Sequence, residues 1–543
     1  MRVLLLTLLT FTILHAFPQA NQFTRQDTLR GSITAERAWW DLTYYHLEQT
    51  VSIEDSSISG VNTIQYKVLA ERDVMQVDLQ APMRIDKVSM GKQTLTVTHE
   101  GNAHFIHFPT KQKLGEIQEV KVYFSGQPKV SKNPPWDGGL SWKADSAGNP
   151  FVATSCQLDG ASLWWPCKDH SYDEPDSMLM SITVPDHLMD VSNGRLRSVQ
   201  DNKDGTKTWN WFVGSPINNY GVNINVADYA YFSDTYEGEN GSLTLDYYVL
   251  KDNLEKAKEH FKQVKPMMEA FEYWFGPYPF YEDGYKLVEV PYWGMEHQSS
   301  VTYGNQYKYG AFGREFYPSG HGMKFDYIII HESGHEWFAN SITNIDVADM
   351  WIHESFTTYS ENLFLDYHYG KQASSEYVIA SRMGILNQKP IIGPYGVNKS
   401  GDGQDMYSKG ANVLHTLRQL VDNDSTWREI LRGLNKTFYH QTVSTQQIEK
   451  FIDERVELDL DKFFDQYLRD ERVPIFEYRT YQDQIIFRWR NCIPGFDMPV
   501  KIKVGEQKVW IEPQTTWTAV RVPEGMKLEV DKNFYVVPFD ISV

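Results

Sequence analysis

The chain has 543 residues, which is too long for one ordinary hydrophobic core and indicates roughly two to four domains. Its formal net charge of -19 at pH 7 argues against nucleic acid and against an anionic membrane surface as partners. Apolar residues make up 41% of the chain and aromatic residues 14%, so large cores can form.

The first 20 residues have the pattern of a secretory signal peptide. A charged start at Arg2 is followed by an apolar run from Val3 to Leu14 and by small residues at Ala16 and Ala20, where cleavage is expected. The run is short for a membrane span of about 20 residues, so cleavage is favoured over a membrane anchor. No later stretch is apolar for long enough to cross a bilayer. We therefore expect an exported protein, periplasmic or secreted, without a span in the mature chain.

The chain contains three cysteines, Cys156, Cys167 and Cys492. In an oxidising compartment the first two can form a disulfide, and Cys492 then remains a free thiol. Three free, buried thiols are the alternative, and the sequence does not decide between them.

Residues 21–245 show mainly the signals of strands and turns. Short β-branched or alternating segments, separated by Gly, Asn and Asp, occur at residues 51–53, 64–69, 95–97, 105–108 and 120–123. This pattern predicts an N-terminal all-β domain over residues 21–245. Within it, residues 133–139 contain two prolines and two glycines and predict a loop long enough to reach a neighbouring site.

Residues 246–473 mix a strand with many helical patterns, which predicts an α/β domain. A helix is expected over residues 254–275, where Pro266 should kink or divide it, and a strand over residues 285–290. Further helices are expected at residues 406–420, 425–435 and 446–455. Strand patterns return after Pro474, at residues 485–489, 500–504, 509–511 and 517–520, and predict a small β-sandwich over residues 474–543.

The most informative stretch contains His331, Glu332 and His335 in a His-Glu-x-x-His pattern, with Glu354 eighteen residues further on. An apolar run leads into this pattern and no proline interrupts residues 325–341, so a buried helix is expected there. Two histidines four residues apart on a helix face the same side and can bind one metal ion. A second helix is expected over residues 349–369, ending at Gly370, and it places Glu354 as the third ligand.

Catalytic zinc sites usually have three protein ligands and one open position for water. A single zinc held by His331, His335 and Glu354 lowers the pKa of its bound water towards about 7 and polarises a carbonyl, as amide hydrolysis requires. Glu332 is free to accept the proton of that water and to pass it to the leaving amine.

These motifs together resemble the aminopeptidase N and leukotriene hydrolase family of zinc metallopeptidases. The resemblance is carried by Gly294-Met295-Glu296-His297, by the His-Glu-x-x-His pattern with Glu354, and by Tyr407-Ser408-Lys409-Gly410-Ala411. It implies a multidomain α+β fold with an N-terminal β-saddle domain, a thermolysin-like catalytic domain and a small C-terminal β-sandwich. The order of these parts is similar to that of the short members, which lack a large C-terminal helical domain.

The resemblance also implies roles for substrate-binding residues. Gly294 and Met295 belong to a loop that lies along the substrate, and Glu296 binds the free α-amino group of the peptide. Tyr407 stabilises the oxyanion, and Gln157 helps to hold the N-terminal end of the substrate. A carboxylate that pairs with the ammonium group near the metal measures the cut from the N-terminus of the peptide.

The sequence departs from the family pattern at three positions. His297 replaces the usual asparagine after the amine-binding glutamate, and His353 and Ser355 stand where asparagine and glycine commonly flank the third ligand. These changes remove neither a ligand nor the base. Partners that orient the two histidines are also expected, and Asp346, Asp349 and Glu361 are equal candidates.

The sequence thus predicts a zinc aminopeptidase whose substrates are peptides with a free N-terminus. An endopeptidase that uses the same zinc is the nearest alternative, although Glu296 disfavours it. A zinc-bearing binding protein without catalysis is a third reading, and the presence of both Glu332 and Tyr407 argues against it.

Overall fold

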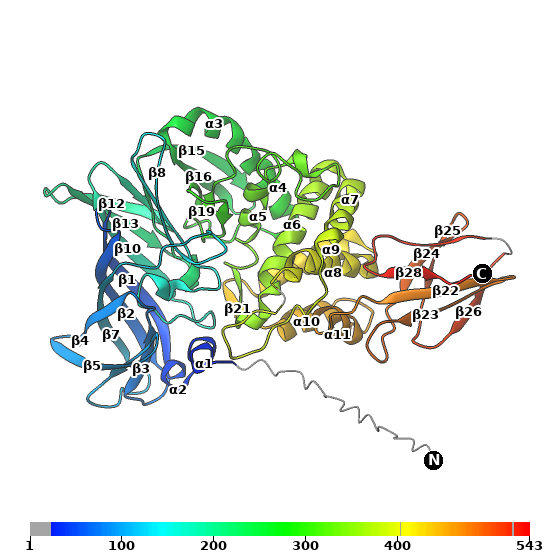
Figure 1. Ribbon diagram of the computed structural model, residues 1–543, viewed down its shortest axis with the longest axis horizontal. Helices are drawn as coiled ribbons and strands as arrows, with labels where there is room; N and C mark the ends of the chain where they lie inside the picture. The colour runs from blue at the N-terminus through cyan, green and yellow to red at the C-terminus, as the bar shows by residue number, and fades with distance from the viewer. Residues whose placement is uncertain (1–22, 402, 524–525, 543) are drawn as a thin grey trace, which may run out of the picture.

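The computed structural model describes residues 23–401, 403–523 and 526–542. The predicted signal peptide over residues 1–20 lies outside this described part of the chain. Three regions follow one another along the long axis of the molecule: a β-rich N-terminal region, a central region of helices and strands, and a C-terminal region of strands (Figure 1). This architecture confirms the predicted multidomain α+β fold class.

A ten-stranded sheet dominates the N-terminal region. In β10, an interior strand of this sheet, buried residues alternate with less buried ones, as expected when one face of a sheet covers a core. In spatial order the strands are β12 (Arg195–Asp201), β13 (Thr206–Val213), β10 (Ser177–Pro185), β1 (Trp40–Ser52), β2 (Ser57–Val68), β7 (Ile117–Gly126), β4 (Arg84–Met90), β5 (Gln93–Glu100), β6 (Ala103–His107) and β3 (Val74–Asp78).

Two short helices, α1 (Arg25–Gly31) and α2 (Ala35–Ala38), precede this sheet. A second sheet contains, in order, β11 (Met189–Val191), β14 (Asn225–Ala227), β9 (Pro150–Ser155) and β8 (Gly139–Ala144). Because β9 ends at Ser155, this sheet delivers the chain directly to Gln157.

The central region begins earlier in the chain than predicted. Strands β15 (Tyr229–Gly238) and β16 (Gly241–Leu250) form one sheet with β17 (Tyr285–Glu289), β19 (Val301–Tyr303) and β18 (Gly294–Met295), in that order. The expected boundary between residues 245 and 246 therefore falls inside β16 and is wrong. The strands before and after it look alike in sequence, and the parallel pairing of β16 with β17 is what assigns them to the central region.

The helices of the central region follow the predicted pattern, and the first of them is divided as expected, although the break precedes Pro266. The expected helix over residues 254–275 is divided into α3 (Leu254–His260) and α4 (Val264–Phe275), and Pro266 lies in the first turn of α4, where a missing N–H needs no partner. The other helices are α5 (Tyr327–Gly334), α6 (Trp351–Tyr369), α7 (Lys371–Ser381), α8 (Asp405–Val421), α9 (Asp424–Thr437), α10 (Thr445–Asp453) and α11 (Asp461–Leu468). Two short strands, β20 (Ile342–Asn344) and β21 (Gln441–Val443), pair in parallel. Helix α6 is buried on all sides from residue 351 to residue 365.

The C-terminal region consists of two small sheets. One contains β26 (Thr518–Arg521), β23 (Gln484–Arg490), β22 (Ile475–Tyr481) and β28 (Val537–Asp540), and the other contains β25 (Gln507–Ile511), β24 (Val500–Val504) and β27 (Leu528–Val530). Apolar side chains of this region join the core of the central region, and the hydroxyl of Tyr467 donates a hydrogen bond to the carbonyl of Tyr535 at 2.8 Å.

All three cysteines are free: Cys156 and Cys167 are buried, and Cys492 is half-buried. Within the part of the chain that the structure describes, every helix is too short or too polar to cross a bilayer.

Candidate active site

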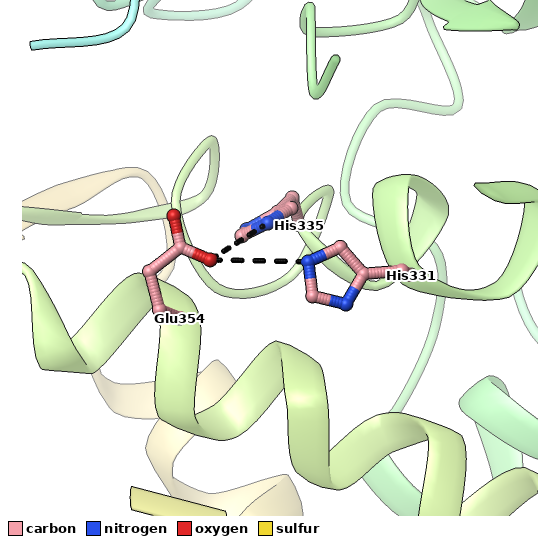
Figure 2. Close-up of side chains that lie close together, drawn as sticks. All are labelled: His331, His335 and Glu354. Atoms are coloured by element: carbon pink, nitrogen blue, oxygen red, sulfur yellow. Dashed lines mark ion pairs between the residues drawn. The ribbon is translucent and has the colours of Figure 1, made fainter. Parts of the chain in front are cut away.

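Three predicted metal ligands converge between α5 and α6 (Figure 2). Oε2 of Glu354 lies 3.8 Å from Nε2 of His331 and 3.5 Å from Nε2 of His335. Ligand atoms bound tetrahedrally to one zinc at about 2.0–2.1 Å lie about 3.4 Å apart, so the three donors are close to a zinc geometry. All three side chains are buried.

Helix α5 begins where its sequence predicts and ends sooner. Asp326 caps its N-terminus by accepting the N–H groups of Ile328 and Ile329 at 2.9 and 3.3 Å. The helix ends at Gly334 rather than near residue 341. His335 is the capping residue and keeps helical dihedrals, φ -64° and ψ -18°, so its ring remains on the same side as that of His331.

Gly334 allows α5 and α6 to pack closely. A Cβ atom at this position would lie 2.5 Å from Oγ of Ser360, which is shorter than any normal contact. The destabilising effect of glycine within a helix, about 1 kcal/mol relative to alanine, is therefore offset by the close approach that brings Glu354 to the histidines.

Each histidine is oriented through its other ring nitrogen. Nδ1 of His331 lies 2.8 Å from Oε1 of Glu361, and Nδ1 of His335 lies 3.1 Å from the carbonyl oxygen of Phe338 and 3.0 Å from Oγ1 of Thr357. Burial lowers the pKa of His331 to about 3 and that of His335 well below its usual value. Both imidazoles are therefore neutral, which is the form that binds metal.

Glu361 is thus the carboxylate that orients a ligand. The two other candidates have different roles. Asp349 accepts hydrogen bonds from Thr445 and from the hydroxyl of Tyr395, and Asp346 caps a short turn by accepting the N–H of Ala348.

An unsatisfied buried oxygen of Glu354 supports a bound cation at this place. Oε2 of Glu354 is buried and accepts no hydrogen bond from the described residues, although it is the oxygen that faces both histidines. Burial and the nearby charge of Glu296 raise the pKa of Glu354 to about 8. A buried carboxylate oxygen without a donor is unfavourable, and a divalent cation bound between these three donors would satisfy it.

Two further carboxylates adjoin the metal ligands. Donor atoms of Glu296, Glu332 and His335 lie within 4.8 Å of one another. Burial raises the pKa of Glu296 to about 7. Burial, with the charges of Glu296 and Glu354, raises the pKa of Glu332 well above its usual value, so this side chain binds a proton readily.

Gln157 connects the amine-binding candidate with a metal ligand. Its Nε2 atom donates to Oε1 of Glu296 and to Oε1 of Glu354, at 2.7 Å in both cases. Gln157 comes from the loop after β9, whereas Glu296 directly follows the edge strand β18. The N-terminal region therefore contributes directly to the site.

Tyr407 enters the site from the first turn of α8. Its ring stacks at 6.1 Å from that of His331, and burial, with the nearby charges of Glu354 and Glu296, raises the pKa of its hydroxyl well above the usual value. Ser355 positions this turn, because its Oγ donates to the carbonyl of Met406 at 2.7 Å. Gly410 permits the contact, since a Cβ atom there would lie 1.8 Å from Ser355 Oγ.

Two residues that the sequence analysis did not single out hold the Glu296 loop. Glu336 accepts the N–H of Ser299 at 3.0 Å, and Asn340 donates to the carbonyl oxygen of Glu296 at 2.9 Å. The sequence itself indicated that Glu336 is unusual, because this charged residue directly follows the ligand candidate His335 and precedes two aromatic residues. A third missed residue is Tyr220, whose pKa is raised well above the usual value by burial and by the nearby charge of Glu296.

The two histidines at unusual positions do not join the ligand set. His297 is fully buried, with Nδ1 at 3.2 Å from Oγ1 of Thr302. Nε2 of His353 accepts the N–H of Asn344 at 2.8 Å, and the ring stacks at 6.4 Å from that of Tyr220. His353 therefore supports the tyrosine that lies near Glu296.

This geometry, with neutral histidines, an unpaired glutamate oxygen and an adjacent protonatable carboxylate, is that of a zinc-metallopeptidase site. Comparison with known proteins agrees. Residues 259–467 match the model of the peptidase family M1 domain. The chain therefore carries a domain of peptidase family M1, which confirms the resemblance seen in the sequence.

The similarity to individual known proteins is at low sequence identity. The chain is 23% identical over 309 residues to mouse endoplasmic reticulum aminopeptidase 1 and 22% identical over 444 residues to leucine aminopeptidase 2 of Vanderwaltozyma polyspora. These matches cover 54% and 76% of this chain, but only 32% and 63% of the relatives. A solved M1 zinc metallopeptidase mutant from Deinococcus radiodurans, bound to a Tyr-Ser-Ala substrate, superposes with a TM-score of 0.67 at 20% identity, covering 82% of this chain and 98% of that one.

Proposed function

We propose that the protein is a zinc-dependent aminopeptidase that removes single residues from the free N-terminus of peptides. The observation that carries the proposal is the position of Glu296, whose carboxylate lies within 4.8 Å of donor atoms of Glu332 and His335. In a peptide, the amino nitrogen and the carbonyl carbon of the first residue are about 2.5 Å apart. An ammonium group held by Glu296 therefore brings the first peptide bond, rather than a later one, to the metal ligands.

Each residue of the candidate site has a separate role in the proposed reaction. When bound, zinc acts as a Lewis acid that polarises the scissile carbonyl and makes water nucleophilic near neutral pH. Glu332 accepts a proton from the attacking water and passes it to the leaving amine, a role that its raised pKa supports. Tyr407 donates a hydrogen bond to the developing oxyanion. Gln157 holds the carboxylate of Glu296 toward the substrate amine, and Tyr220 lies near this carboxylate.

A matched pair of peptides tests this proposal. The zinc-loaded protein is given a peptide with a free amino group and its N-acetylated twin, with a chelator control, and both are followed by mass spectrometry. We expect the free peptide alone to shorten, one residue at a time and only with metal. Internal cleavage of both peptides indicates an endopeptidase, and no cleavage of either contradicts catalysis.

We further propose that the protein is exported to a periplasm or secreted. The support is the charged start, short apolar run and small residues of the first 20 positions. N-terminal sequencing of protein recovered outside the cytoplasm tests this, and we expect a new terminus shortly after Ala16 or Ala20. An intact Met1 on the recovered protein contradicts cleavage.

A further inference from the structure

An aromatic cluster lies beside the metal site and comprises Trp136, Trp293, Phe312, Phe316 and Tyr327. The ring of Trp293 lies 5.9 Å from that of Trp136, 5.4 Å from that of Phe312 and 5.4 Å from that of Tyr327. Phe316 stacks at 4.9 Å on Tyr327. Three of the five rings face solvent, since Trp136 is 67% exposed, Phe312 42% and Phe316 44%.

The aromatic cluster is continuous with the candidate active site at two points. Tyr327 stacks on the metal-ligand candidate His331, with ring centroids 5.2 Å apart and an angle of 13° between the rings. Trp293 immediately precedes Gly294, the first residue of edge strand β18. A molecule that extends out of the site along β18 therefore meets the cluster.

The loop that carries Trp136 is held in place by two carboxylates. Asp137 accepts the N–H of Asn133 at 2.6 Å, and Asp159 accepts the N–H of Gly138 at 2.6 Å. These bonds hold the backbone on both sides of Trp136, and the ring itself contacts Trp293. An exposed tryptophan that contacts Trp293, at the edge of a cluster with four other aromatic rings, forms an apolar surface that a ligand can cover.

The direction of a bound peptide follows from burial. Under the proposed function, the amino group of the peptide lies at Glu296. Residues 297–300 are fully buried, and the N–H of Ser299 is bonded to Glu336, so this side is closed. The route toward solvent runs antiparallel to β18, toward Trp293, where Trp136, Phe312 and Phe316 are exposed. The free edge of β18 offers backbone groups for that pairing.

We propose that the aromatic cluster is the subsite for the residues after the scissile bond, and that it takes an apolar or aromatic side chain at the second or third position of the peptide. The proposal rests on the proposed function for the direction of the peptide. Burial of a peptide side chain against these rings removes apolar surface from water on both partners.

Three tetrapeptides test the subsite on the zinc-loaded protein: Leu-Phe-Ala-Ala, Leu-Ala-Phe-Ala and Leu-Ala-Ala-Ala. We expect a kcat/KM about tenfold higher for at least one phenylalanine peptide than for the alanine peptide. This preference should fall by about fivefold in Trp136→Ala and Phe312→Ala, and Trp136→Phe should restore most of it. Phe539→Ala is the matched control, because this ring is 50% exposed on β28, in the C-terminal region, and its loss should leave the preference unchanged.

A binding measurement separates the subsite from turnover. Calorimetric titration of the zinc-loaded Glu332→Gln variant with the same peptides should give a Kd about tenfold lower for the preferred phenylalanine peptide. If N-terminal trimming occurs but all three peptides are bound and cleaved equally, the subsite is overturned and the proposed function stands. If no peptide is trimmed from its free N-terminus, the proposed function fails, and the subsite fails with it.

Discussion

The amide nitrogen of Gln157 lies 2.7 Å from Oε1 of Glu296, although 139 residues separate them in the chain. The same nitrogen donates to Glu354. These bonds lower the pKa values of both carboxyls against the rise that burial causes. Under the proposed function, the N-terminal region thereby keeps two carboxylates of the candidate site ready to bind cations, one a metal ion and the other an ammonium group.

We expect Gln157→Ala to weaken both kinds of binding. Removing a donor from a buried carboxylate has a free-energy cost of about 1–3 kcal/mol, so zinc retention should fall by about tenfold and KM for peptides should rise. Competition with a chromophoric chelator measures the first effect and steady-state kinetics the second. Gln419→Ala, on the far part of α8, is the control, and equal zinc affinity in both variants would contradict this role for Gln157.

The variant Glu332→Gln should retain zinc and lose turnover. The amide is nearly isosteric with the carboxylate but cannot accept the proton of the attacking water, and general-base catalysis contributes about 10²–10⁴-fold. Metal analysis and kcat on one free-amino peptide check the two parts together. Normal kcat with full zinc content would remove Glu332 from the mechanism.

The variant Tyr407→Phe should lower kcat by about 10²–10³-fold, because it removes one hydrogen bond to the oxyanion. KM should change little, since the ring that stacks near His331 remains. A variant that changes KM alone would show that Tyr407 binds the ground state of the substrate instead.

Packing between α6 and α8 should control the position of Tyr407. In Gly410→Ala, the new Cβ atom would lie 1.8 Å from Oγ of Ser355, so α8 must shift. We expect a lower Tm and a lower kcat. The double variant Ser355→Gly with Gly410→Ala removes the two closest atoms and should recover part of both losses. No difference between the single and double variants would exclude this contact as the cause.

The metal-free protein should become less stable as the pH rises from 6.5 to 8. Burial raises the pKa values of Glu354 and Glu361 from 4.5 to about 8, so the folded state keeps protons that the unfolded state has released. The free energy of unfolding therefore falls with pH in this window. Below pH 6.5 the histidines, whose pKa values are lowered, act in the opposite direction.

Zinc should reverse this trend, because it binds the deprotonated form of Glu354. The gain in Tm on adding zinc to chelator-treated protein should thus be larger at pH 8 than at pH 6.5. Thermal unfolding of both forms at the two pH values measures it. A gain that is constant or smaller at pH 8 would mean that these carboxyls are already ionised without metal.

The metal ligands could be predicted because each depends on local periodicity. His331 and His335 share a helix face, and Glu354 lies on the next helix. The sequence also allowed Glu361 to be distinguished from Asp346 and Asp349 as the partner of a ligand histidine. It lies seven residues after Glu354, which is two turns of α6 and hence the same face, and this face packs on α5.

Other features depend on contacts between distant segments. The 2.7 Å bond of Gln157 to Glu354 joins positions 197 residues apart, and no local pattern specifies it. The boundary at residue 245 was wrong for the same reason, since β15 and β16 have ordinary strand patterns and only their neighbours in the sheet assign them. The aromatic cluster is likewise assembled from three separate segments, around residues 136, 293 and 312–327.

Asn340 and Glu336 tie the Glu296 loop to the turn that follows His335. Glu296, the proposed amine-binding residue, and His335, a candidate metal ligand, are therefore joined by hydrogen bonds within the central region. Under the proposed function, the central region alone therefore sets how many residues are released per cut. Rotation of the N-terminal region would move Gln157 and Trp136, and would thereby alter affinity and sequence preference without changing the length of the product.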